Sequence, residues 1–131
     1  MIVLDTHALI WWVNGSTGLS SAALGHIEDA RQQAQLFASS ISAWEVAMLL
    51  SRGRLAFSIG IFEWLHLVEQ IEGLRFIPVD NDIAIKSTLL PGEFHKDPAD
   101  RMIVATAQHI GATIISVDEK IRDYPHVKSM G

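Results

Sequence analysis

The sequence predicts an α/β fold with a mainly parallel central sheet. Short apolar runs without polar alternation recur along the chain, as in strands that are buried on both faces. Segments with apolar residues every three or four positions lie between these runs and are typical of helices. Because strands alternate with helices throughout, we expect parallel pairing with helices on both faces of the sheet.

The first elements follow from apolar runs and helix-ending residues. Met1–Leu4 is an apolar run that predicts a buried strand. A helix from Thr6 to Val13 follows, and Asn14-Gly15 ends it. Ser20 or Ser21 is placed to cap a second helix that runs to Gln33. Leu36–Ser39 is predicted to be the second strand.

The middle of the chain predicts two helices and a strand. A helix over Ser42–Ser51 is expected to stop at Arg52-Gly53. Ser58–Glu72 has apolar residues at helical spacing, which predicts the longest helix of the protein. Gly73 ends that helix, and Arg75–Val79 is expected to form the next strand.

The last third of the chain continues the alternation. A helix over Asn81–Leu89 leads into a loop, Leu90–Lys96, and a helix over Pro98–His109 follows with proline at its first position. Gly111 ends that helix. The remaining predicted elements are a strand over Thr113–Val117, a short helix opened by Asp118, and an edge strand over Val127–Ser129.

Length and composition predict one domain that spans residues 1–131. The chain has 131 residues, and 49% of them are hydrophobic, which is enough to build a core. Only 19% are charged, so a disordered chain is excluded. There is no cysteine, which excludes disulfides, a thiolate zinc site and a cysteine nucleophile.

The apolar N-terminal stretch is neither a signal peptide nor a membrane span, because it carries Asp5 and His7 and has no leading basic cluster. We therefore expect a cytoplasmic protein that does not bind membranes. The net charge of −5 argues against coating nucleic acid by bulk charge. It is compatible with a small nuclease whose acidic site is offset by a divalent metal.

Four acidic residues are predicted to meet at one end of the sheet. Parallel sheets place their sites at the carboxyl ends of the strands. Asp5 ends the first strand, and Asp118 ends the strand Thr113–Val117. Glu45 lies in the helix after the second strand, and Asp100 lies in the first turn of the helix that begins at Pro98.

Helix capping is the alternative interpretation of these acids. Asp5, Asp97 and Asp118 stand where N-caps belong, and such caps are common and stabilising. Ser42-x-x-Glu45 fits a capping box, and Asp97-x-x-Asp100 fits one less well. For any one of these carboxylates taken alone, capping is the favoured role.

Two features favour a shared site. Glu45 lies on the same helical face as Met48 and Leu49, whereas a capping glutamate would point to water. Acids at about 4 Å repel by roughly 4 kcal/mol per pair at an effective dielectric constant of ~20. No lysine follows them closely enough to be an obvious counter-ion, although Arg101 is placed to offset one. Oxygen ligands select Mg²⁺ or Mn²⁺, ions that support phosphodiester hydrolysis.

The chain resembles the PIN domain family, and in particular the VapC-type ribonuclease toxins of bacterial toxin–antitoxin systems. The resemblance covers nearly the whole chain. It rests on four ordered blocks, which are Ile2-Val3-Leu4-Asp5-Thr6, Ser42-Ala43-Trp44-Glu45-Val46-Ala47, Asp97-Pro98-Ala99-Asp100-Arg101-Met102-Ile103-Val104-Ala105-Thr106-Ala107 and Ile115-Ser116-Val117-Asp118.

The resemblance implies a three-layer α/β/α sandwich and an endoribonuclease that depends on Mg²⁺, with Mn²⁺ as a possible substitute. It implies that Asp5 is the central metal ligand, that Asp100 lies beside it and that Asp118 binds the metal directly or through water. It also implies that Glu45 completes the catalytic set and helps to orient the attacking water. Among the supporting residues that it implies, Thr6 and Ser116 match hydroxyl positions, although threonine is more usual than Ser116. Asp97 is better explained as a cap, so any metal role of Asp97 would be indirect.

The resemblance also implies partners, namely an RNA substrate and a cognate antitoxin that covers the acidic edge; a homodimer is expected as well. A non-catalytic PIN-like module that binds RNA or protein is the main rival interpretation, although loss of an acid would be expected there. A receiver-like phosphoryl acceptor would need a lysine near the acids. His7 and His95 are interpreted as ordinary surface or loop residues.

Overall fold

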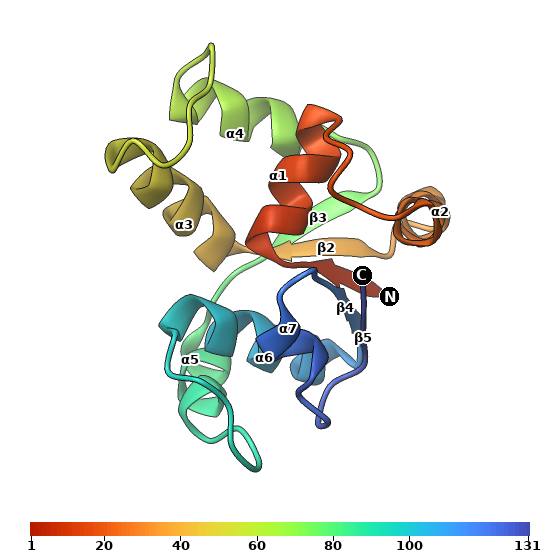
Figure 1. Ribbon diagram of the computed structural model, residues 1–131, viewed down its shortest axis with the longest axis vertical. Helices are drawn as coiled ribbons and strands as arrows, with labels where there is room; N and C mark the ends of the chain where they lie inside the picture. The colour runs from red at the N-terminus through yellow and green to blue at the C-terminus, as the bar shows by residue number, and fades with distance from the viewer.

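The computed structural model describes all residues from Met1 to Gly131 and contains one sheet of five parallel strands (Figure 1). The strands lie in the order β3-β2-β1-β4-β5, and every neighbouring pair is parallel, as predicted. The strands are β1 (Ile2–Leu4), β2 (Leu36–Ser39), β3 (Leu74–Ile77), β4 (Thr113–Ile115) and β5 (Ser129–Met130).

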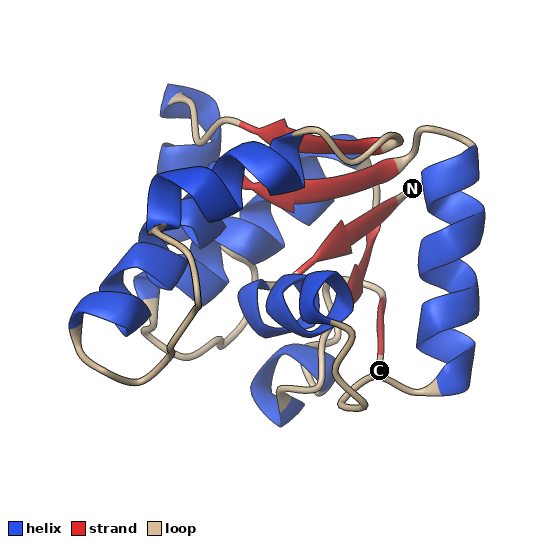
Figure 2. Ribbon diagram, turned by 90° about the horizontal axis from the view of Figure 1, so that it is seen from above, coloured by secondary structure: helices blue, strands red, loops and turns tan.

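Seven helices complete the fold and cover both faces of the sheet, which confirms the predicted three-layer α/β/α arrangement. Figure 2 shows the strands lying between the helices. The helices are α1 (Thr6–Asn14), α2 (Ser21–Gln32), α3 (Ser40–Ser51), α4 (Ile61–Glu69), α5 (Asn81–Thr88), α6 (Pro98–Ile110) and α7 (Glu119–Arg122). None of them is long and apolar enough to cross a membrane.

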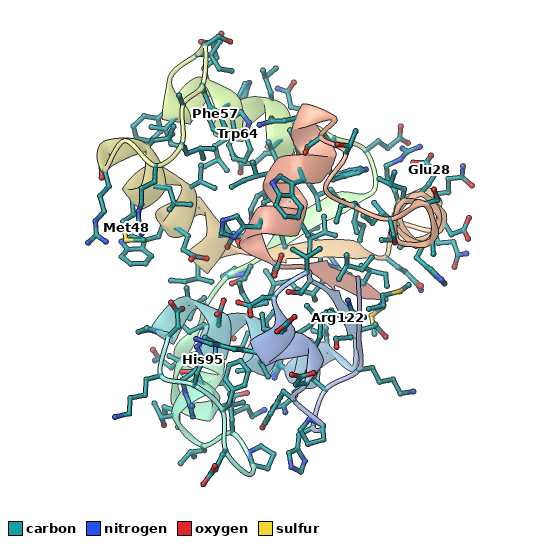
Figure 3. The ribbon with its side chains drawn as sticks, in the orientation of Figure 1. Glu28, Met48, Phe57, Trp64, His95 and Arg122 are labelled. Atoms are coloured by element: carbon teal, nitrogen blue, oxygen red, sulfur yellow. The ribbon has the colours of Figure 1, made fainter.

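The alternation of side chains along β1 divides the core into two halves. Ile2 and Leu4 face one half, which contains the buried residues of α1, α2, α3 and α4. Val3 faces the other half, which contains those of α5, α6 and α7. Both faces of this central strand are therefore buried, which explains its unbroken apolar sequence. In the first half, Trp64 of α4 is buried and stacks on Phe57, with ring centroids 4.9 Å apart (Figure 3).

Several predicted boundaries differ from the structure, most of all in α4. The helix predicted over Ser58–Glu72 is much shorter, because it starts only after Gly60 and ends at Glu69. The longest helix is instead α6, with 13 residues. The strand predicted over Arg75–Val79 runs from Leu74 and ends at Ile77, directly before Pro78, which has no N–H to give to a sheet.

Helix α3 begins at Ser40, two residues before the predicted start. The Ser39 side chain caps it by accepting a hydrogen bond from the Ile41 backbone N–H at 3.1 Å. Ser42 is therefore inside the helix, so the proposed Ser42-x-x-Glu45 capping box is wrong. Ser42 is fully buried, and its hydroxyl lies 2.9 Å from the Thr6 hydroxyl.

The strand order creates a crevice beside the central strand. After β1 the chain passes to α1 on one face, whereas after β4 it passes to α7 on the other face. These two strands are neighbours, so their following segments diverge at the carboxyl edge of the sheet. Such a reversal point is where open α/β sheets bind their ligands.

Candidate active site

A pocket of about 340 Å³ lies at this reversal point. Most of the residues that line it are polar, and five of them are acidic. The lining residues are Asp5, Thr6, His7, Trp11, Glu45, Asp97, Asp100, Val117 and Asp118. The prediction that the four carboxylates of Asp5, Glu45, Asp100 and Asp118 approach one end of the sheet is therefore confirmed, and Asp97 joins them.

Asp5 is held at the floor of the pocket by the start of α1. Its Oδ1 accepts a hydrogen bond from the Ala8 backbone N–H at 2.9 Å, so Asp5 is the N-cap of the helix. Only 5% of the residue is exposed. Burial raises the pKa of Asp5, while hydrogen bonds from the Ser116 hydroxyl and the Ala8 N–H act to lower it. Capping and a place in the pocket are thus compatible for one residue.

Glu45 reaches the pocket from α3, as its apolar helical face predicted. The Thr6 hydroxyl donates a short hydrogen bond to Glu45 Oε1, and Thr6 also contacts the buried Ser42. Burial is the main cause that raises the pKa of Glu45, and the charges of Asp97 and Asp5 raise it further. A chain of hydroxyls therefore fixes this carboxylate at the end of β1, and Thr6 has the supporting position that the sequence assigned to it.

Asp97 and Asp100 come from the first turn of α6. Asp97 Oδ1 accepts a hydrogen bond from the Asp100 backbone N–H at 2.9 Å, which confirms that Asp97 is the N-cap. The pKa of Asp100 is raised to about 7, chiefly by burial and then by the negative charges of the neighbouring carboxylates. A carboxyl with this pKa is only about half ionised at neutral pH, and a nearby cation would favour its charged form.

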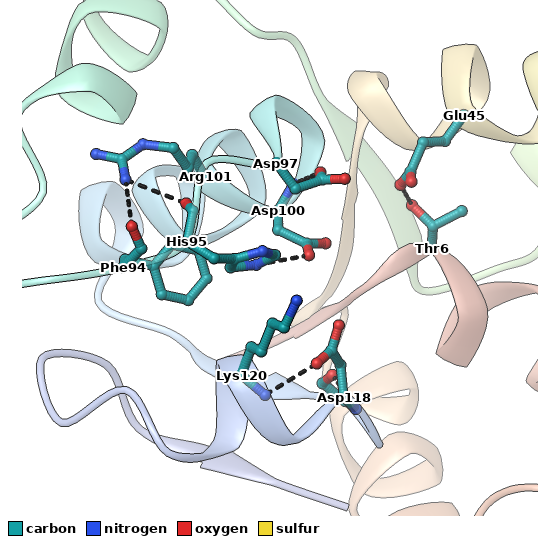
Figure 4. Close-up of polar contacts among 10 residues, drawn as sticks. Thr6, Glu45, Phe94, His95, Asp97, Asp100, Arg101, Asp118 and Lys120 are labelled. Atoms are coloured by element: carbon teal, nitrogen blue, oxygen red, sulfur yellow. Dashed lines mark hydrogen bonds and ion pairs between the residues drawn. The ribbon is translucent and has the colours of Figure 1, made fainter.

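Asp118 completes the pocket from the opposite side. Its Oδ1 accepts a hydrogen bond from the Lys120 backbone N–H at 2.9 Å and so caps α7 (Figure 4). The Ser116 hydroxyl accepts a hydrogen bond from the Asp118 backbone N–H at 3.0 Å. Ser116 therefore contacts Asp118 directly, and its hydroxyl also acts to lower the pKa of Asp5.

Arg101 does not neutralise any of these acids, so its suggested role as a counter-ion is wrong. Its guanidinium turns away from the pocket and donates hydrogen bonds to three backbone carbonyls, those of Ser87, Phe94 and His95, at 2.8–3.3 Å. None of the five acids forms an ion pair with a lysine or an arginine. The pocket therefore carries an excess of negative charge.

His95 is a site residue that the sequence interpretation missed. Its Nε2 lies 2.9 Å from Oδ2 of Asp100, and this is the one ion-pair contact of the acidic group (Figure 4). His7 and Trp11 line the pocket itself. The sequence places His95 two residues before the Asp97 cap and so near the acids. The direction of its side chain depends on the conformation of a loop, which the sequence does not predict.

The donor set fits a hard divalent cation. All five acidic groups offer oxygen, the ligand atom of Mg²⁺ and Mn²⁺, and there is no thiolate in the chain. The oxygens line the pocket without converging on one point, so no three acidic or histidine side chains form a ready ligand set. Burial, and to a lesser extent the neighbouring carboxylates, raise the pKa values of Asp5, Glu45 and Asp100, and a bound cation would favour their charged forms.

Comparison with known proteins identifies the family. A family model of the PIN domain matches residues 2–127, and the chain therefore belongs to the PIN domain family. A curated relative is ribonuclease VapC22 from Mycobacterium tuberculosis. It is 33% identical over 125 residues, which cover 95% of this chain and 92% of the relative.

Solved structures share the fold at lower identity. VapBC2 from Rickettsia felis, bound to a DNA fragment from its promoter, aligns with a TM-score of 0.71 and 16% identity, over 99% of this chain and 98% of that chain. A toxin–antitoxin complex from Klebsiella pneumoniae aligns with a TM-score of 0.64 and 20% identity, over 97% of this chain and 95% of that chain.

Proposed function

We propose that this protein is an endoribonuclease dependent on Mg²⁺ or Mn²⁺ and the toxin of a type II toxin–antitoxin module. The observation that carries the proposal is a pocket with five carboxylates and no lysine or arginine partner, at the reversal point of a PIN domain. The identity to ribonuclease VapC22 over nearly the whole chain supports RNA as the substrate.

Each acid would have a distinct task in phosphodiester hydrolysis. Asp5, Asp100 and Asp118 would hold the cation, with Asp5 fixed most rigidly by its burial and its cap. When bound, Mg²⁺ would offset the charge of the phosphate, increase the acidity of the attacking water and stabilise the leaving oxygen. Glu45, oriented by Thr6, is placed to direct the attacking water and accept its proton.

RNA cleavage in the presence and absence of metal tests this function. We expect the purified chain to cleave RNA with Mg²⁺ or Mn²⁺ and to stop in excess EDTA. Asp80→Asn is a matched control for asparagine substitutions of the pocket acids. Asp80 also caps a helix, since its Oδ1 accepts a hydrogen bond from the Ile83 backbone N–H at 2.9 Å, but it does not line the pocket. Cleavage that persists in excess chelator would exclude the metal mechanism. Metal-independent RNA binding without cleavage would favour the non-catalytic PIN-like module.

A protein antitoxin is the second part of the proposal. The toxin–antitoxin complex that shares this fold supports such a partner. An acidic pocket without a paired lysine or arginine suits an antitoxin segment that inserts an arginine or lysine. We expect the protein to inhibit growth when expressed alone and not when its antitoxin is co-expressed. Equal toxicity of wild type and Asp5→Asn would show that the growth effect is not enzymatic.

We also propose that the protein pairs with a second copy of itself to form a homodimer. Large apolar side chains are exposed on several helices, including Trp44 of α3 and Ile85 of α5, at 56% and 60% exposure. Such residues are common at interfaces between subunits. Light scattering of the isolated protein should give about twice the mass of the chain, and a monomeric mass at micromolar concentration would contradict the dimer.

The cytoplasmic location stays a prediction.

A further inference from the structure

The loop between α5 and α6 brings a histidine against Asp100, one of the acids that line the pocket. His95 lies in this loop, two residues before the N-cap of α6, and its Nε2 is 2.9 Å from Asp100 Oδ2. The Nε2 atom is shielded from solvent and has no aligned hydrogen bond. The side chains of His95 and Asp100 are 21% and 17% exposed, so water competes little for this contact.

Three independent contacts hold the loop in this conformation. The Arg101 guanidinium donates hydrogen bonds to the carbonyls of Phe94 and His95, at 3.0 and 3.3 Å. The Tyr124 hydroxyl donates to the carbonyl of Pro91. The Phe94 ring packs against both Tyr124 and His95, with centroid distances of 4.8 and 4.5 Å. The backbone on either side of His95 is thus anchored, and the ring is pressed towards Asp100.

This anchoring uses groups that would otherwise be available to the acids. Arg101 follows Asp100 directly in sequence, yet all its hydrogen bonds go to backbone carbonyls and none goes to a carboxylate. The charge of the arginine is therefore used to shape the loop. The side chain that the shaped loop presents to Asp100 is the imidazole of His95.

We propose that His95 is a positioning residue of the active site, which rests on the function proposed above. It holds Oδ2 of Asp100 against the imidazole and leaves Oδ1, which has no hydrogen-bond partner, for the cation. A carboxylate has two oxygens, so one can contact a neighbouring side chain while the other serves as a ligand. Partners of this kind orient metal ligands, and their loss typically costs 10- to 100-fold in metal affinity or activity.

The experiment measures Mn²⁺ binding by electron paramagnetic resonance and RNA cleavage for wild type, His95→Ala and His95→Gln. The glutamine amide nitrogen can take the place of Nε2. We expect His95→Ala to weaken Mn²⁺ binding and cleavage by about 10-fold. His95→Gln should recover most of the loss. The melting temperature in EDTA should fall by the same small amount in both variants, because each loses the contact of the imidazole with the Phe94 ring.

His109→Ala is the matched control, because His109 Nδ1 contacts the carboxylate of Asp82 at 3.2 Å, outside the pocket. It should bind Mn²⁺ and cleave RNA like wild type. Unchanged binding and cleavage in His95→Ala would overturn the inference and leave the proposed function intact. Tighter Mn²⁺ binding would also overturn it, since His95 would then compete with the ion.

Two further outcomes distinguish a failure of the His95 role from a failure of the proposed nuclease function. If His95→Ala and His95→Gln lose Mn²⁺ affinity and melting temperature equally, His95 is only a packing residue and the positioning role is wrong. If wild type neither binds Mn²⁺ nor cleaves RNA, the proposed function itself fails, and the role of His95 fails with it.

Discussion

The Asp5 carboxylate caps helix α1 and lines the pocket at the same time. The Ala8 N–H donates to only one of its oxygens, Oδ1, so the cap leaves the second oxygen available as a ligand. Asp118 combines the two roles in the same way on α7. The N-terminal ends of two helices thus place carboxylates at known positions, and the partial positive charge there makes the acidic group less costly.

Neutralising one of these acids should separate the site from the cap. Asp5→Asn still offers an oxygen to the Ala8 N–H, so the cap survives. We expect cleavage to be lost, while the stability without metal is unchanged or raised by about 1 kcal/mol because a buried charge is removed. Asp100→Asn should behave alike. Melting in EDTA and an RNA cleavage assay measure both effects, and wild-type cleavage by both variants would disprove the site.

Asp97 should respond in the opposite way. Asp97→Ala removes the cap on the Asp100 N–H and should lower the unfolding free energy by about 1 kcal/mol. Asp97 is exposed, and its charge raises the pKa of Asp100, so the loss of this charge offsets part of the cost. Much of the cleavage activity should remain. Asp97→Asn keeps the cap and should melt near wild type; a complete loss of activity in both variants would make Asp97 a catalytic residue.

Elements with clear end signals were predicted well from the sequence. Helix α1 stops directly before Gly15, which has a φ of 69°, and α6 stops directly before Gly111, which has the same φ; this conformation favours glycine. Helix α4 was overextended, because its apolar spacing continues into Ser58–Ile59 and the break at Gly60 has no such signature. Asp5 and Asp118 could be predicted because they follow strands, and Glu45 and Asp100 because of their positions in helices. His95 could not be predicted, because its position depends on the distant Tyr124 and on Arg101.

Arg101 should control the order of the whole α5–α6 loop. Arg101→Met removes hydrogen bonds to three carbonyls, of which two lie in the loop at Phe94 and His95. We expect faster amide hydrogen exchange over residues 90–96 and a lower melting temperature, because hydrogen bonds to a charged group contribute about 1.5–3 kcal/mol in folded proteins. Mass spectrometry of exchanged peptides measures the effect. Exchange rates equal to wild type would show that the loop is held by Tyr124 and Phe94 alone.

At the scale of the whole molecule, the stability of the protein depends on whether protons or cations offset the charges of the pocket. The strand order concentrates the acids that follow β1 and β4, together with acids of α3 and of the start of α6, in one crevice, far more densely than the net charge of −5 suggests. The metal-free protein therefore carries repulsion that the rest of the core must offset. Its stability should depend on pH and on divalent cations together.

The stability of the metal-free protein should fall as pH rises towards neutrality. The pKa of Asp100 is about 7 in the folded state against 3.8 in its unperturbed form, and the pKa values of Asp5 and Glu45 are also raised. Between about pH 4 and 7 the folded protein thus binds more protons than the unfolded chain, so its unfolding free energy decreases with pH. Exposed acids with lowered pKa values, such as Asp82, affect the pH dependence of the unfolding free energy only below this pH range.

Added Mg²⁺ should reverse this trend, because protons compete with the cation for the same oxygens. We expect the difference between melting temperatures in Mg²⁺ and in EDTA to be small at about pH 5 and to grow up to about pH 8. Asp100→Asn should flatten the pH dependence in EDTA and reduce the gain from Mg²⁺, whereas the capping control Asp80→Asn should change neither. A gain from Mg²⁺ that is independent of pH, or equal in Asp100→Asn, would show that the ion binds elsewhere on the protein.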